Sequence, residues 1–81
     1  MASHTVPMCT NWTGRPGDQV TFTNGTAFTA TVTASGAWPF TADPGFQIPT
    51  QGFTTSLKTG LASAVYYYDV DRCSQKSVTV P

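Results

Sequence analysis

Residues that could carry catalytic chemistry are few in this 81-residue chain. His4 is the only histidine, so a serine–histidine–aspartate triad would have to recruit it from an N-terminal end that we expect to be flexible. Glutamate is absent, and glycoside hydrolysis needs two carboxylates facing each other across a cleft. Asp18 and Asp43 stand in expected turns, where side-chain hydrogen bonds to the backbone account for them. The sequence therefore predicts a protein that is not an enzyme.

The other two aspartates, Asp69 and Asp71, share a face at strand spacing. A weak Ca²⁺ site there would have to draw most of its ligands from backbone carbonyls and water. We favour a different interpretation, in which both are solvated charges at the end of a strand and pair with Arg72. Because the glycines are dispersed along the chain, no glycine-rich loop could cradle a phosphate. We expect no cofactor and no metal site.

The two cysteines, Cys9 and Cys73, lie near opposite ends of the chain. In a small, weakly charged domain we interpret them as a disulfide; the alternative is two buried thiols that never meet. A bridge closing a loop of about 65 residues would remove about 4 kcal/mol of unfolded-state entropy. Such a bridge needs an oxidising compartment, so we expect an extracellular or periplasmic location. Residues 1–4 lack the basic start and the apolar stretch of a signal peptide, and they are typical of a processed or recloned start.

Charge and hydropathy exclude several classes of partner. Four Lys and Arg residues balance four aspartates, so the net charge is zero and no basic stripe is available for nucleic acid. No apolar run approaches the roughly 20 residues that a membrane-spanning helix needs. The chain is 40% hydrophobic and 10% charged, unlike a disordered tail. We expect one globular domain, residues 1–81, that does not bind nucleic acid and does not span a membrane.

The elements that must position these side chains are strands. Threonine is abundant and leucine occurs only twice, so residues that favour a pleated surface outnumber good helix formers. Alternation of apolar and polar residues predicts about seven short strands, and hence an all-β, antiparallel β-sandwich. The predicted strands are residues 5–9, 20–23, 28–33, 46–48, 53–58, 64–70 and 78–80. Pro39 confines the piece at residues 38–40 to an edge or a bulge. The predicted core comprises Val20, Phe22, Phe28, Val32, Trp38, Phe40, Ile48, Leu57, Tyr66, Tyr68, Val70, Val78 and Val80.

The order of short motifs adds a resemblance to a known fold. A Pro-Gly-Asp turn at residues 16–18 leads into Gln-Val-Thr-Phe-Thr-Asn at residues 19–24. An alternating tyrosine strand at residues 66–68 and a Val-Thr-Val end at residues 78–80 follow. From about residue 14 to 80 the chain resembles the cupredoxin fold, a Greek-key β-sandwich, with an immunoglobulin-like sandwich as the second choice.

The resemblance departs from copper-binding cupredoxins at the ligands. Those proteins take a histidine after the second motif, and then a cysteine, a histidine and usually a methionine before the last strand. The corresponding positions here fall near Ala30, Val70 and Cys73. A site built from His4, Met8 and Cys9 would need the N-terminus to fold across the ligand end. The resemblance thus implies a metal-free domain in which Cys73 links a shortened ligand loop to the first strand, and a small copper protein is the main rival.

Exposed aromatic side chains offer a binding surface. Alternation directs Tyr67 away from the face that carries Tyr66 and Tyr68. Together with Trp12 or Trp38, Tyr67 could form a platform for a sugar ring or a partner protein. We expect Trp38 in the core and leave Trp12 open.

Threonines form a second candidate surface. Thr29, Thr31 and Thr33 share one strand face, and Thr21 and Thr23 would stand beside them if the two strands are neighbours. Flat arrays of this kind occur in ice-binding proteins, although threonine is also ordinary on an exposed β-face. The favoured function is therefore a non-catalytic exported module that binds a protein or a glycan through an aromatic and threonine-rich surface.

Two further features leave alternatives open. The stretch at residues 41–51 is long and braced by prolines, so it could present a loop to a protease as an inhibitor does. Asn11 and Asn24 both begin Asn-x-Thr sequences, which are glycan acceptors in eukaryotic secreted proteins. A threonine-rich chain also produces such matches by coincidence.

Overall fold

The computed structural model describes residues 2–81, and these residues form strands and no helix. The prediction of an all-β chain is confirmed. Eight strands are present instead of about seven, because a two-residue strand follows the first one. Their bounds are β1 Ser3–Pro7, β2 Trp12–Thr13, β3 Gln19–Thr23, β4 Ala30–Ala34, β5 Phe46–Ile48, β6 Phe53–Ser56, β7 Ala64–Val70 and β8 Gln75–Val80.

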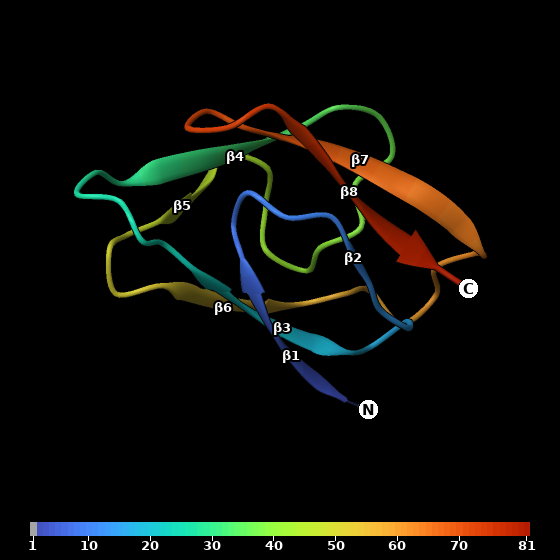
Figure 1. The fold of residues 1–81 in the computed structure, drawn as a ribbon. Helices are drawn as coiled ribbons and strands as arrows, with labels where there is room; N and C mark the ends of the chain where they lie inside the picture. Colours follow the sequence, from blue (N-terminus) through green and yellow to red (C-terminus); the bar gives the residue numbers. More distant parts are fainter. Residues whose placement is uncertain (1) are drawn as a thin grey trace.

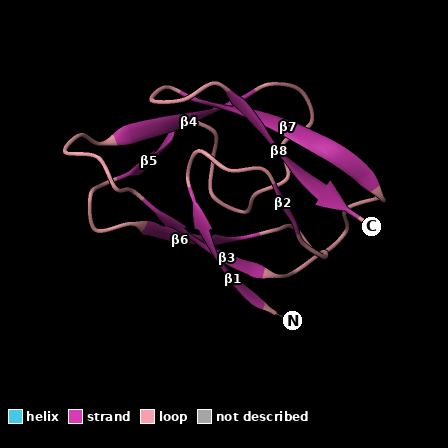
Figure 2. Ribbon diagram, viewed as in Figure 1, coloured by secondary structure: helices cyan, strands magenta, loops and turns pink. Residues whose placement is uncertain are grey.

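The strands form two sheets, drawn in Figures 1 and 2. Sheet A has the order β1-β3-β6, and sheet B has the order β2-β8-β7-β4-β5. The expectation of purely antiparallel sheets is wrong, because β1 pairs parallel with β3 and β2 pairs parallel with β8. After Pro7 the chain leaves sheet A and joins sheet B at Trp12, so one N-terminal segment supplies an edge strand to each sheet. Side-chain alternation indicates which face of a sheet a residue occupies. It does not indicate whether the neighbouring strand runs parallel or antiparallel.

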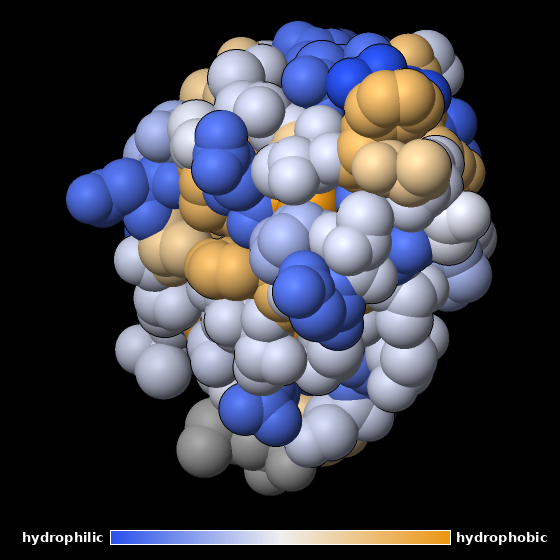
Figure 3. Space-filling view, turned by 90° about the vertical axis from the view of Figure 1, so that its left-hand side faces the viewer, coloured by the Kyte–Doolittle hydropathy of each residue, from blue (hydrophilic) through white to orange (hydrophobic). Residues whose placement is uncertain are grey.

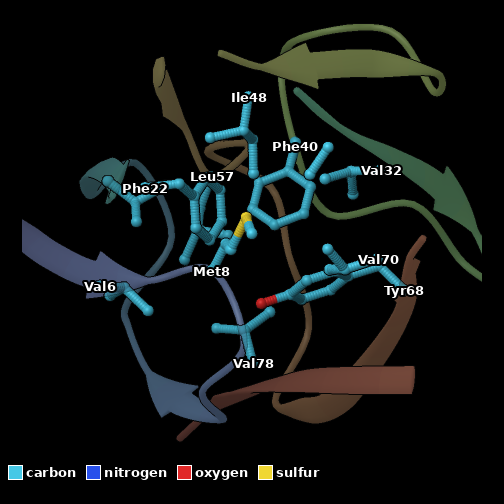
Figure 4. Close-up of a cluster of buried hydrophobic side chains, with 12 residues drawn as sticks. Val6, Met8, Phe22, Val32, Phe40, Ile48, Leu57, Tyr68, Val70 and Val78 are labelled. Carbon is cyan, nitrogen blue, oxygen red and sulfur yellow. The ribbon is translucent and has the colours of Figure 1, made fainter. Parts of the chain in front are cut away.

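Buried side chains from both sheets form one cluster, shown in Figure 4. Phe22 of sheet A, Tyr68 of sheet B and Phe40 of the β4–β5 connection are fully buried within it. Ten of the thirteen predicted core residues are buried, and Trp38 and Tyr66 pack against the cluster while half-buried. The ten are Val20, Phe22, Val32, Phe40, Ile48, Leu57, Tyr68, Val70, Val78 and Val80.

Phe28 is the predicted core residue that the structure contradicts. Its side chain is 60% exposed, because β4 begins at Ala30 and not at residue 28. Asn24 holds the preceding loop in place by donating from Nδ2 to the carbonyls of Phe28 and Ile48, at 2.8 and 2.9 Å. The Arg72 guanidinium lies over the Phe28 ring, 4.7 Å from its centroid. Figure 3 views the molecule from the end where these loops lie, and it shows separate hydrophobic areas within a surface of mostly intermediate or hydrophilic character.

The segment around Phe40 closes the free edge of β6. Phe40 forms an antiparallel bridge with Leu57, and the backbone N–H of Thr41 donates to the carbonyl of Ser56 at 2.9 Å. The Lys58 N–H donates to the Pro39 carbonyl. Proline has no backbone N–H, so Pro39 takes part in this pairing only as an acceptor. This placement agrees with the edge position expected for residues 38–40.

A disulfide joins the two ends of the chain. Cys9 lies in the crossing from β1 to β2, and Cys73 lies in the turn between β7 and β8. Their Cα atoms are 5.7 Å apart across a sequence separation of 64 residues. The predicted pairing is confirmed. Within residues 2–81, no helix has the length and hydrophobicity to cross a membrane.

Candidate functional site

Tyr67 stands on the outer face of sheet B, near the middle of its longest strand. The side chain is 47% exposed, whereas the next residue, Tyr68, is fully buried. Val65, two residues earlier on the same face, is 45% exposed. The orientation that alternation predicted for Tyr67 is thus confirmed, and its role in binding stays a prediction. We call this surface the Tyr67 face; it comprises Thr13, Thr31, Thr33, Val65, Tyr67, Asp69, Gln75, Ser77 and Thr79.

Polar groups flank Tyr67 on both neighbouring strands. Ser77 of β8 is its direct cross-strand partner. Asp69, the next outward residue of β7, pairs with Thr33 of β4 on one side and with Gln75 of β8 on the other. Tyr67 is therefore an apolar ring surrounded by hydroxyl, amide and carboxylate groups. Residues 2–81 enclose no pocket. The exposed side chains of Tyr67 and Val65 leave this face open to solvent.

Two hydrogen bonds hold the flanks of the Tyr67 face. Gln75 Nε2 donates to Ser35 Oγ at 2.7 Å, across the width of β7. On the far side of β8, Asn11 Oδ1 accepts the Ser77 backbone N–H at 3.1 Å. Both contacts restrict polar side chains before any ligand arrives, which lowers the conformational entropy that binding would cost.

The structure does not bring either tryptophan onto the Tyr67 face. Trp12 pairs with Val78, whose side chain is buried, so the indole lies on the inner side of sheet B. Its Nε1 donates to the Tyr68 hydroxyl at 3.0 Å. Trp38 packs edge-on against Phe40, with ring centroids 5.2 Å apart. An aromatic platform made of Tyr67 and a tryptophan is not formed.

The predicted threonine ranks are divided between the two sheets. Thr31 and Thr33 lie on β4 of sheet B, whereas Thr21 and Thr23 lie on β3 of sheet A. The neighbours of β3 are β1 and β6 and do not include β4, so the expectation that these threonines form a single array is wrong. Thr29 precedes β4 and is exposed in the loop.

A different threonine row runs across sheet A. Thr21 pairs with Thr5 of β1 and with Thr54 of β6. The hydroxyls of Thr21 and Thr54 are 2.9 Å apart and hydrogen-bonded to each other. Each of these two hydroxyls therefore uses part of its hydrogen-bonding capacity within the sheet. This leaves fewer free groups to order water than a row of unpaired threonine hydroxyls would have.

Part of the stretch that could serve as an inhibitor loop lies in sheet B. Residues 46–48 are β5, which pairs with β4, and Ile48 is fully buried. The Gly45 N–H donates to the Val32 carbonyl at 2.7 Å. The middle of the stretch at residues 41–51 is thus held in sheet B, whereas most residues on either side of it are exposed. Presentation of this stretch to a protease stays a prediction.

The positions of the copper ligands hold other groups. Ala30 and Val70 are buried apolar residues, and Cys73 is bonded to Cys9. His4 lies on β1, hydrogen-bonded to Asp18, and is not at a flexible end. Over residues 2–81, no three His, Cys, Asp or Glu side chains gather as a metal would require.

The turn role predicted for Asp18 is confirmed by its hydrogen bond with the Arg15 backbone, and Ala2 and His4 add contacts that the sequence did not predict. The carboxylate is buried, and it accepts hydrogen bonds from the backbone N–H groups of Ala2 and Arg15, at 2.9 and 3.0 Å. His4 Nε2 lies 2.8 Å from Asp18 Oδ2. The hydrogen bond from His4, together with those from Arg15 and Ala2, holds the pKa of Asp18 well below its usual range. Asp18 thus fastens the start of β1 to the turn before β3.

The same end of the core contains a buried phenol. Burial raises the pKa of Tyr68 to about 12, although the Trp12 N–H donated to its hydroxyl acts in the opposite direction. The phenol therefore stays protonated at physiological pH. Together with the T-shaped contact of Trp12 on Phe22, at 6.2 Å between centroids, it links β2 to the core.

We expect acid to destabilise the protein through Asp18. Because its pKa is lower in the folded state than in the unfolded chain, its contribution is fully present above about pH 5 and is lost as the pH falls through 4 and below. Asp18→Asn should lower the melting temperature at pH 7 and flatten the loss of stability between about pH 5 and pH 2. Thermal unfolding followed by circular dichroism at several pH values measures both effects.

Asp43→Asn is the matched control, since Asp43 is exposed in a loop. It should follow the wild-type pH profile. Parallel profiles for wild type and Asp18→Asn would contradict the assignment of the acid sensitivity to Asp18.

Comparison with known proteins adds no family. The chain matches no protein-family model and no curated protein. Among the described residues, the Tyr67 face combines two exposed hydrophobic side chains, Val65 and Tyr67, with polar neighbours on the adjoining strand. We therefore take the Tyr67 face as the candidate site.

Proposed function

We propose that this chain is a single, metal-free, cupredoxin-like β-sandwich domain that is exported and binds a glycan or a protein without catalysis. The observation that carries the proposal is Tyr67, which is 47% exposed on the outer face of a sheet whose inner face is buried. A large aromatic ring exposed on a rigid strand is a common anchor for ligands, because little conformational entropy is lost when it binds.

The positions of the motifs support the cupredoxin-like fold. The turn at residues 16–18 leads into β3, the tyrosine run lies on β7, and the Val-Thr-Val end lies on β8. The replacement of the copper positions by Ala30, Val70 and a disulfide-bonded Cys73 supports the metal-free form. A copper protein would need thiolate and imidazole ligands that are engaged elsewhere in this chain.

The disulfide supports export. A small domain with a bond between Cys9 and Cys73 is consistent with an extracellular or periplasmic location, where such bonds persist. The zero net charge and the scarcity of charged side chains on the Tyr67 face agree with a neutral ligand.

A glycan is the ligand class that the Tyr67 face favours. The apolar face of a sugar ring can stack on Tyr67, while its hydroxyls bond to flanking groups such as Asp69 and Gln75. The open surface, without a pocket in the described residues, suits a chain of sugars more than an isolated small molecule.

Binding to insoluble polysaccharides tests the proposal. Cellulose, chitin, xylan and mannan are incubated with the protein, and the amount depleted from solution is measured. We expect at least one polysaccharide to retain the wild type, and Tyr67→Ala to weaken that binding about tenfold, which corresponds to about 1.4 kcal/mol.

Two variants make the test specific. Tyr67→Phe keeps the ring and should retain most of the binding. Phe28→Ala removes the other strongly exposed aromatic ring, which lies in a loop outside the Tyr67 face, and should have no effect. Retention of Tyr67→Ala at wild-type level, or no retention of wild type on any polysaccharide, would refute glycan binding by this face.

A further inference from the structure

The two Asn-x-Thr sequences of this chain stand in opposite environments. One begins at Asn11 and includes Thr13, and the other begins at Asn24 and includes Thr26. An oligosaccharide is attached to the side-chain nitrogen of the asparagine, so that nitrogen must be reachable and free of other bonds. The structure therefore allows the two sequences to be distinguished.

Asn24 is closed to modification. The residue is 7% exposed, and its Nδ2 uses both hydrogens in bonds to the carbonyls of Phe28 and Ile48, at 2.8 and 2.9 Å. Its Oδ1 accepts from the backbone N–H and the hydroxyl of Thr26, at 2.9 and 2.7 Å. A sugar on Nδ2 would displace a hydrogen bond inside the protein and would need space that the backbone of Ile48 occupies.

Asn11 is open. It is exposed in the crossing between β1 and β2, and its Oδ1 accepts the Ser77 N–H at 3.1 Å. Within the described part of the chain its Nδ2 has no hydrogen-bond partner. Thr13, which completes the acceptor sequence, is exposed on β2. The same crossing carries Cys9, whose disulfide forms in the oxidising compartments through which glycosylated proteins pass.

We infer that Asn11 is an acceptor site for an N-linked oligosaccharide and that Asn24 is not one in the folded protein. The donor is a lipid-linked oligosaccharide pyrophosphate, and the catalyst is the transferase of a eukaryotic secretory pathway. Asn11 Nδ2 forms a bond to the anomeric carbon of the first sugar as the bond from that carbon to the pyrophosphate oxygen breaks. The lipid pyrophosphate leaves with the electron pair, and Nδ2 loses one proton to a base of the transferase. This inference does not depend on the proposed function of the Tyr67 face.

Secretion of the full chain from a eukaryotic host tests the inference. The secreted protein is treated with peptide N-glycosidase in ¹⁸O water, which converts each glycosylated asparagine to labelled aspartate, and its peptides are read by mass spectrometry. We expect the label at Asn11 in most molecules, above the level in a sample kept in ¹⁸O water without the glycosidase. Asn24 is tested on folded protein in the second assay, with the same enzyme-free control, because Asn24 precedes Gly25 and can deamidate without a glycan. Thr13→Ala should abolish the modification, while Thr13→Ser should retain it, and neither change should disturb folding because Thr13 is exposed.

A second assay covers the case in which the chain is not secreted. Folded protein purified from an oxidising bacterial compartment is incubated with solubilised transferase and the lipid-linked donor, and the same two peptides are measured. Glycosidase-dependent label at Asn11 in either assay, and none at Asn24 in the second, supports the inference. An unmodified Asn11, or label at Asn24 on folded protein, overturns it.

Discussion

Replacement of both Cys9 and Cys73 by alanine is expected to lower the free energy of unfolding by about 4 kcal/mol. The bond spans 64 residues, and without it the unfolded chain regains the entropy of an open loop of that length. A domain of this size has a total stability of only about 4–12 kcal/mol, so the variant should be close to the limit of folding. Cys9 is exposed and Cys73 half-buried, so little of the loss comes from packing.

Urea unfolding followed by tyrosine and tryptophan fluorescence measures this effect. Wild-type protein reduced with dithiothreitol is the control, since it loses the bond and keeps both side chains. It should unfold at nearly the same urea concentration as the double variant. A shift below about 1 kcal/mol in both samples would show that the bridge contributes little, and free thiols in denatured, unreduced wild type would show that it does not form.

Phe40→Ala is expected to cost about 3–5 kcal/mol, the range for a large aromatic side chain removed from a core. Phe40 is fully buried on the β4–β5 connection, where its ring packs edge-on against the rings of Phe22 and Tyr68 at 5.7 and 5.2 Å. It also packs edge-on against Trp38 and Phe46, at 5.2 and 5.7 Å. Loss of this ring leaves a cavity bordered by all four side chains.

Phe28→Ala is the matched control for that change. The same atoms are removed, but the Phe28 ring is 60% exposed and its contact is with the Arg72 guanidinium. We expect a loss below about 1 kcal/mol, the usual range for an exposed cation–π pair. Equal destabilisation by the two substitutions, measured by urea unfolding, would contradict the division between core and surface described here.

Local alternation was enough to predict much of this fold. In the tyrosine run, Tyr68 is buried and Tyr67 is exposed, because successive residues of a strand point to opposite faces. The Cys9–Cys73 pairing followed from a small chain with two distant cysteines. The alternation depends on residue type and on neighbours one or two positions away, which the sequence states directly. The disulfide spans 64 residues, but two cysteines allow only one pairing within the chain.

Features that depend on distant segments could not be predicted in the same way. The parallel pairing of β1 with β3 depends on where the chain returns, and alternation contains no such information. Phe28 continued an alternating pattern, but the hydrogen bonds of Asn24 keep residues 24–29 out of the strand. The contact between His4 and Asp18 spans 14 residues and exists only because β1 lies beside β3.

The position of the disulfide also determines which parts of the molecule would bear a mechanical load. A pull on the two termini is transmitted through the segments outside the closed loop, and these contain β1 at one end and β8 at the other. β1 would shear along β3, and β8 along β2 and β7, while the 64-residue span between the cysteines could not lengthen. Under tension the domain would therefore behave as a short tether that yields at its two end strands and keeps β7, with Tyr67, inside the locked loop.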